Sequence, residues 1–271
     1  MFSTGHLLWI GISLLLIVGG TIAIRVRKPA LDQVLKFCLA VGVASEAVKV
    51  LTVAQILPMV TPQIAGGELT YTVSGTYSPY LEMAHLPLEM CSLMIAFLAL
   101  ALLIKNELWR ERLLTMMYIS GVIGGLMGIF LAYITSEFHT VAEYCASPRV
   151  WQYFLYHAMV VTLGIYLGFG RESQISLRSL KPTMLMILVL DLPTFYLNSV
   201  FSQAVYVDEK PVGLVYRTNF FSSYVNPLGL VLSEKWQWIA YLCVRMLLAT
   251  ALISLLLWLS GAVRRTGKSR G

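Results

Sequence analysis

The stretch HLPLEMCSLMIAFLALALLI, residues 85–104, decides the class of this protein. Its second half is unbroken apolar sequence, and the whole stretch has the length that a helix needs to cross a bilayer, about 20 residues. Four chemically distinctive residues open it: His85, Pro87, Glu89 and Cys91. Pro87 is harmless at the start of a helix, where its missing N–H needs no partner. The other three are costly near hydrocarbon, so the protein must use them or satisfy them.

The composition extends this conclusion to the whole chain. Of 271 residues, 58% are hydrophobic and only 13% charged, whereas about a quarter of a soluble domain is charged. Mean hydropathy is +0.74. The sequence therefore predicts an all-α, polytopic membrane protein, a single seven-helix bundle over residues 1–271 with no separate soluble domain. The predicted spans lie near 7–24, 37–60, 86–104, 113–134, 151–169, 183–203 and 237–260.

The distribution of basic residues predicts the orientation. Alternate connections and the carboxyl-terminal tail carry 14 of the 20 lysines and arginines. Under the positive-inside rule, the amino terminus is then outside and the carboxyl terminus cytoplasmic. The net charge of +6 is explained by this topology, so we expect no nucleic-acid partner. The two long loops, 61–84 and 204–236, fall outside, and the first is expected to cap the bundle or line a substrate entrance.

The four cysteines are Cys38, Cys91, Cys145 and Cys243. No two of them form a CxxC pair, so we expect no closed zinc or iron–sulfur site and no cofactor. The topology puts Cys91 and Cys145 near the outer side. A disulfide between them is an alternative to a free, reactive thiol at Cys91.

Four charged residues lie inside predicted spans: Glu46, Lys49, Asp191 and Arg245. At about 1.5 Å rise per residue, all four are expected near one layer at the membrane midplane. Glu46 and Lys49 are three residues apart and can pair on one helix face. The layer is either a neutral buried network that holds three helices together or a proton or ion pathway.

A second polar layer is predicted nearer the outside. Cys91 and His157 are each five or six residues into a helix that runs inward, so they match in depth. Asn198 falls at the same level, as do His85 and Glu89. A cysteine, a histidine and a carboxamide are the parts of a nucleophilic site, although each is also common as packing in an apolar helix.

Two further motifs indicate helix structure. The small-residue stripe GVIGGLMG, 121–128, allows close approach of a neighbouring helix. Pro193 should kink the sixth span and free backbone groups near its middle.

Three motifs then occur in a familiar order: HLPLEMC (85–91), YFLYH (153–157) and TNFFSSYVNPLG (218–229). From about residue 40 to residue 245 the chain resembles the YwaF-like family of bacterial integral membrane proteins. It is also similar to their eukaryotic relative, a transmembrane acyltransferase that makes polyunsaturated ether phospholipids. The resemblance implies a protein of the bacterial cytoplasmic membrane.

The resemblance also implies roles for single residues. It makes Cys91 a nucleophile and His157 its partner, with a membrane phospholipid or lysolipid as substrate. Glu89 departs from the neutral residue usual in the family, and its charge, if close, would oppose a thiolate at Cys91. Alternatively, Glu89 points to the other side and hydrogen-bonds a loop. Asn219 and Asn226, in the third motif, are expected to close the site from the last outer loop.

The leading functional hypothesis is a lipid acyltransferase or acyl hydrolase that works through an acyl-cysteine thioester, with Asn198 or His85 donating to the oxyanion. A zinc-dependent lipid amidase is a second possibility, although the sequence has no HExxH pair. Its ligands would come from His85, His139, His157, Glu89, Glu137 and Glu143. A transporter or sensor that uses the midplane charges and Pro193 is the non-enzymatic alternative.

Overall fold

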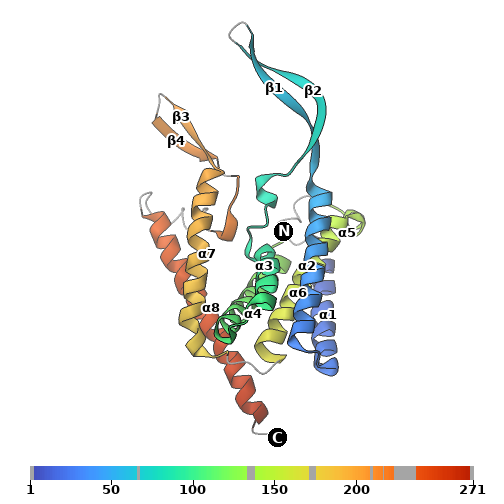
Figure 1. The fold of residues 1–271 in the computed structure, drawn as a ribbon, viewed down its shortest axis with the longest axis vertical. Helices are drawn as coiled ribbons and strands as arrows, with labels where there is room; N and C mark the ends of the chain where they lie inside the picture. The colour runs from blue at the N-terminus through green and yellow to red at the C-terminus, as the bar shows by residue number, and fades with distance from the viewer. Residues whose placement is uncertain are drawn as a thin grey trace.

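The computed structural model describes residues 3–65, 68–132, 138–170, 175–207, 210–215, 217–222 and 236–268. The described chain is mostly helical. Its helices of 14 residues or more are α1 (Thr4–Arg27), α2 (Leu31–Val53), α3 (Met90–Leu103), α4 (Glu107–Phe130), α6 (Pro148–Ile165), α7 (Leu180–Val200) and α8 (Gln237–Lys268). They run up and down the long axis of the molecule, and the carboxyl terminus lies at the end opposite the hairpins (Figure 1).

Five of these helices are long and apolar enough to span a membrane. They are α1, α4, α6 with its continuation to Gly170, α7 with the turn before it, and α8. The protein is therefore a polytopic membrane protein. Helices α2 and α3 lie at the positions of the two other predicted spans, but α2 carries several charged residues and α3 is only 14 residues long.

Local sequence explains where several helices begin and end. The side chains of Ser3 and Asn106 accept hydrogen bonds from the N–H groups of His6 and Trp109, which caps α1 and α4. Pro148 occupies the first turn of α6, where a backbone N–H has no partner within the helix, so the N–H that proline lacks is not missed. Lys28 ends α1 in the left-handed conformation, with φ of 46°.

Two antiparallel hairpins correct the all-α prediction. Strands β1 (Gln55–Ala65) and β2 (Glu68–Tyr80) form one, and β3 (Gln203–Val207) and β4 (Lys210–Val215) form the other. Both stand at the same end of the molecule, and the first projects away from the helices rather than capping them (Figure 1). The second predicted span extended to residue 60, but α2 ends at Val53, because Pro58 disfavours a helix and the β-branched residues around it favour a strand.

The core has two parts. One lies among α2, α3, α4 and α6, and its fully buried members include Leu35, Met94 and Leu114. The other surrounds Trp9 and Phe154, whose rings stack at 5.5 Å where α1 meets α6. Helices α7 and α8 contribute few buried residues, so most of their apolar surface is left for lipid.

Candidate functional site

Cys91 is the second residue of α3, a helix that begins on its hairpin side (Figure 1). Its side chain is half-buried and its thiol is free. The backbone N–H and the hydroxyl of Ser92 both donate toward its sulfur. The first turn of a helix favours negative charge, since its N–H groups have no partner within the helix. The unpaired N–H groups at this position can donate to the oxygen of a bound carbonyl group.

Charges of both signs flank Cys91. The buried ammonium of Lys49 is close enough to favour a negative charge on the sulfur, and the carboxylate of Glu89 is close enough to oppose it. Lys49 is also paired with Glu46 at 2.5 Å on the same face of α2. Glu46 therefore offsets much of the charge of Lys49.

His157, on α6, is buried and fixed in direction. Its Nδ1 lies 2.7 Å from the carbonyl oxygen of Tyr153, which accepts the Nδ1 hydrogen. The neutral ring then has its lone pair on Nε2, as a general base requires. Among the described residues no hydrogen bond joins Cys91 to His157. Tyr153 is near both residues. Its ring packs on the imidazole of His157 at 4.2 Å between centroids, and its hydroxyl is within electrostatic reach of Cys91.

Tyr156, the neighbour of His157 in sequence, connects α6 to α3. Its hydroxyl donates to the carbonyl oxygen of Cys91 at 2.6 Å. Successive residues on a helix point about 100° apart, so Tyr156 faces α3 while His157 faces α4. Sequence reasoning predicted a shared depth for Cys91 and His157 but not this difference in direction.

A glycine stripe on α4 sets the position of His157. A Cβ atom on Gly121 would lie 2.9 Å from the carbonyl oxygen of Val160, and one on Gly125 would lie 2.6 Å from the side chain of Val161. A Cβ on Gly128 would lie 2.5 Å from Nε2 of His157. The small-residue stripe predicted from GVIGGLMG therefore packs directly against α6, and its last member makes room for the imidazole.

The turn η5 (Phe220–Ser222), from the TNFF motif, is fixed to the start of α3. Buried Asn198 binds Phe220 in both directions, accepting its N–H at 2.9 Å and donating to its carbonyl at 3.1 Å. The N–H of Phe221 donates to Glu89 at 3.3 Å, and its carbonyl accepts from Arg245 at 2.9 Å. Asn198 and Glu89 therefore hold this turn near the start of α3. The sequence allowed such a loop contact for Glu89 but not for Asn198.

Phe221 itself is strained. Its φ of 57° and ψ of 17° put it in the left-handed region, which costs a bulky L-residue roughly 1–2 kcal/mol. Such strain persists only where surrounding contacts enforce it, and it concentrates at functional sites. Here the enforcing contacts are those of Glu89 and Arg245 with the two sides of the residue.

The four charges expected in one midplane layer form two separate ion pairs. Asp191 pairs with Arg245 between α7 and α8, and Lys49 pairs with Glu46 within α2. The early end of α2 at Val53 explains the difference, since it puts Lys49 about one turn from the end of its helix rather than near the middle. Pro193 lies inside α7, two residues after Asp191.

The remaining predicted site residues are His85, Asn219 and Asn226. His85 closes the short helical turn η1 (Met83–His85) that precedes α3, and it is half-buried. Asn219 is half-buried next to the turn η5. Asn226 lies outside the described residues. Cys91 and Cys145 are both free thiols, so the disulfide alternative is not what the structure contains.

The residues considered for zinc do not gather. Among the described residues, no three His, Cys, Asp or Glu side chains are grouped to hold a metal, and Glu137 lies outside that part of the chain. Glu143 has another role: it accepts hydrogen bonds from the N–H groups of His139 and Thr140 and so caps α5 (Val141–Ala146). These donors hold the pKa of the Glu143 carboxyl below its ordinary value.

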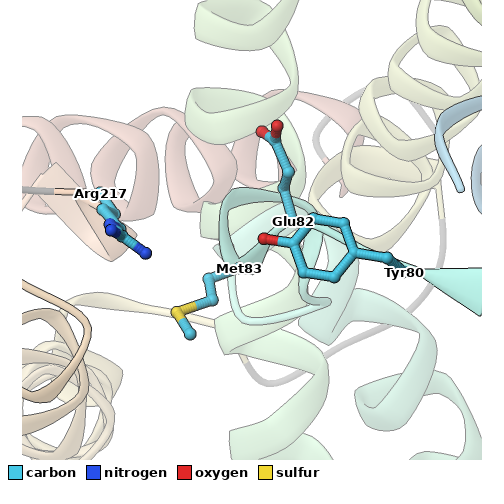
Figure 2. Close-up of a pocket in the computed structure, with 4 residues that line it drawn as sticks. All are labelled: Tyr80, Glu82, Met83 and Arg217. Atoms are coloured by element: carbon cyan, nitrogen blue, oxygen red, sulfur yellow. The ribbon is translucent and has the colours of Figure 1, made fainter. Parts of the chain in front are cut away.

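A cavity of about 330 Å³ opens at the hairpin end of the molecule, lined by Tyr80, Glu82, Met83 and Arg217. Figure 2 shows the Tyr80 hydroxyl and Met83 directed toward the side on which Arg217 lies, whereas Glu82 points away. Tyr80 ends β2 and Met83 begins η1, so the cavity adjoins the segment that leads to Glu89 and Cys91. Arg217 adds a cation at its edge.

Comparison with known proteins identifies the family. The sequence profile of the TMEM164 family matches residues 1–257, which is nearly the whole chain. This chain belongs to the TMEM164 family. No curated protein and no solved structure matches it. The TMEM164 family is a transmembrane family, in agreement with the five candidate membrane-spanning helices.

Proposed function

We propose that this member of the TMEM164 family is a membrane lipid acyltransferase or acyl hydrolase that works through an acyl-cysteine at Cys91. The observation that carries the proposal is the position of Cys91: a half-buried free thiol in the first turn of α3, within reach of both Ser92 donors and of Lys49. Hydrogen-bond donors and a cation near the sulfur favour a nucleophilic cysteine.

The reaction begins when the Cys91 sulfur attacks the ester carbonyl carbon of a phospholipid. His157 accepts the thiol proton at Nε2, and the N–H groups at the start of α3 donate to the oxyanion that forms. When the ester C–O bond breaks, His157 returns the proton to the departing lysolipid hydroxyl, which leaves the acyl group on sulfur. A second lysolipid hydroxyl or a water then attacks the thioester, and its proton restores the thiol.

Tyr153 supports the pairing of two side chains that are not in direct contact. Its ring packs on His157, while its hydroxyl lies within electrostatic reach of Cys91 and donates to the carbonyl of Gly128 at 2.9 Å. Catalytic hydrogen bonds are often long without substrate and tighten when it binds.

The proposal includes seven spans, with α2 and α3 added to the five long apolar helices. It puts the amino terminus and both hairpins outside and the carboxyl terminus in the cytoplasm, because the basic connections follow the positive-inside rule. Cys91 then faces the outer leaflet of a bacterial cytoplasmic membrane. The cavity beside Tyr80 and Arg217 would receive the phosphate head group, and no cofactor takes part. The proposed relation to ether-phospholipid acyltransferases suggests the class of chemistry.

The test is intact mass spectrometry of purified protein after incubation with a mixed phospholipid. Wild type should gain a fatty-acyl mass that hydroxylamine removes, and Cys91→Ala should gain none. Cys145→Ala is the matched control, since it removes an exposed thiol at the same end of the molecule and should acylate normally. His157→Gln should slow acylation about 100-fold or more. Equal acylation of wild type and Cys91→Ala would exclude the proposed nucleophile.

A transporter is the second candidate, and the Asp191–Arg245 pair beside Pro193 favours it. An ion pair next to a helix-breaking proline is typical of a transport helix. Uptake into proteoliposomes that survives Cys91→Ala but fails with Asp191→Asn would replace the enzyme by the transporter. If Cys91→Ala abolishes turnover of lipid while Asp191→Asn only lowers stability, the enzyme proposal stands.

A further inference from the structure

A second, larger cavity lies at the end of the bundle away from the hairpins. Its volume is about 520 Å³, and its walls come from α1, the end of α6, the turn η3 (Tyr166–Gly170) and α8. Ile24, Phe169 and Val263 give it apolar sides. Because α3 starts at the opposite end, this cavity is separate from Cys91 and takes no part in the chemistry proposed above (Figure 1).

The cavity is built where α6 changes its winding. Over η3 the helix becomes a π-helix, a rare geometry that is frequent at functional sites. The turn is firmly held: the Tyr166 hydroxyl donates to the carbonyl of Pro29 at 3.3 Å, and a Cβ on Gly168 would lie 2.3 Å from the ring of Tyr118. The widened turn is thus a fixed part of the fold, and its residues Tyr166 and Phe169 face the cavity.

The polar groups of the cavity are suited to an anion. Arg25 and Lys28 stand exposed at its rim, and none of its lining residues is acidic. Deeper, the Thr21 hydroxyl is buried and has no hydrogen-bond partner among the described residues. An unpaired buried hydroxyl is unfavourable, so a bound group that accepts its hydrogen bond would remove a cost. The partial negative charge at the carboxyl end of α1 opposes an anion, and the charges of Arg25 and Lys28 offset it.

We propose that this cavity binds an anionic phospholipid from the leaflet at that end of the bundle. The phosphate lies between Arg25 and Lys28, an ester oxygen accepts the Thr21 hydrogen bond, and an acyl chain runs along Ile24, Phe169 and Val263. A free anion would use the cations alone, whereas a lipid also uses the apolar wall. The lipid would add contacts among α1, α6 and α8, the last of which is largely exposed along its length.

Native mass spectrometry of the full-length protein tests this proposal, with phosphatidylglycerol and phosphatidylcholine of identical chains as probes. Wild type should retain phosphatidylglycerol preferentially. Arg25→Gln and Lys28→Gln should each lower that affinity about fivefold, and Thr21→Val should weaken binding of both lipids. Arg27→Gln is the matched control: it removes the same charge from the same helix end, but Arg27 does not line the cavity, so affinity should stay within about twofold.

Three results would overturn the proposal. Equal retention of the two lipids would show that charge is not recognised. An equal loss in Arg27→Gln and Arg25→Gln would show general attraction to a basic surface. Displacement of the lipid by inorganic phosphate would make the ligand a free anion. The altered basic residues are exposed, so the variants should fold, and an unchanged melting temperature in detergent without lipid checks this. Acylation at Cys91 should be unaffected.

Discussion

At the scale of single residues, the candidate site depends on contacts that a side chain makes with backbone groups. Asn198 fixes Phe220, Glu89 fixes Phe221, and Tyr156 fixes the carbonyl of Cys91. Each is a polar side chain in an apolar environment, where an unmade hydrogen bond costs about 1–3 kcal/mol. Glu89, which departs from the family pattern, is thereby explained at least in part as a holder of the turn η5.

Phe221 gives a prediction at this scale. Phe221→Gly and Phe221→Ala lose the same ring contacts, but only glycine adopts a φ of 57° without strain. We therefore expect Phe221→Gly to be more stable than Phe221→Ala by about 1 kcal/mol. Thermal unfolding of the two variants in one detergent measures the difference. If the alanine variant were equally or more stable, the left-handed conformation would not be enforced in the protein.

At the scale of elements, the contact between α4 and α6 decides where the predicted base lies. The glycine stripe lets the helices approach, and Gly128 leaves the space that His157 fills. A helix with larger residues at these positions would stand farther away. The direction of the imidazole is therefore a property of two helices and not of the YFLYH motif alone.

Gly128→Ala tests this arrangement. The added Cβ would fall 2.2 Å from the imidazole ring, so we expect a loss of about 1–3 kcal/mol in stability and a marked fall in Cys91 acylation. Gly124→Ala is the control on the same helix, because a Cβ there has nothing within 4 Å. It should be neutral or slightly stabilising. Equal effects of the two substitutions would argue that His157 is not held by α4.

At the scale of the whole molecule, the two hairpins stand at one end and the carboxyl terminus at the other (Figure 1). The proposed topology predicts that a membrane-impermeant maleimide labels exposed Cys145 in intact cells. In a Cys145→Ala background, a thiol introduced by Lys268→Cys should react only after permeabilisation. The reverse pattern would invert the orientation and assign Cys91 to the cytoplasmic leaflet.

The sequence by itself determined the class of the protein, because the long apolar runs must lie in lipid and form helices there. It also predicted the small-residue contact of α4 and the pairing of Glu46 with Lys49, since both depend only on helical spacing. It did not predict the hairpins. In QILPMVTPQ, residues 55–63, the hydrophobicity continued the span, while two prolines and the β-branched residues indicated its end.

Only the tertiary structure decided which groups meet. That Lys49 lies near Cys91, that Asp191 pairs with Arg245, and that the turn η5 rests on Glu89 all join segments far apart in the chain. Depth along a helix follows from counting residues, but direction around it depends on which neighbour each face packs against. Which faces pack together depends on the side chains along the whole length of each helix. His157 therefore faces α4 and Tyr156 faces α3, although the two are adjacent in sequence.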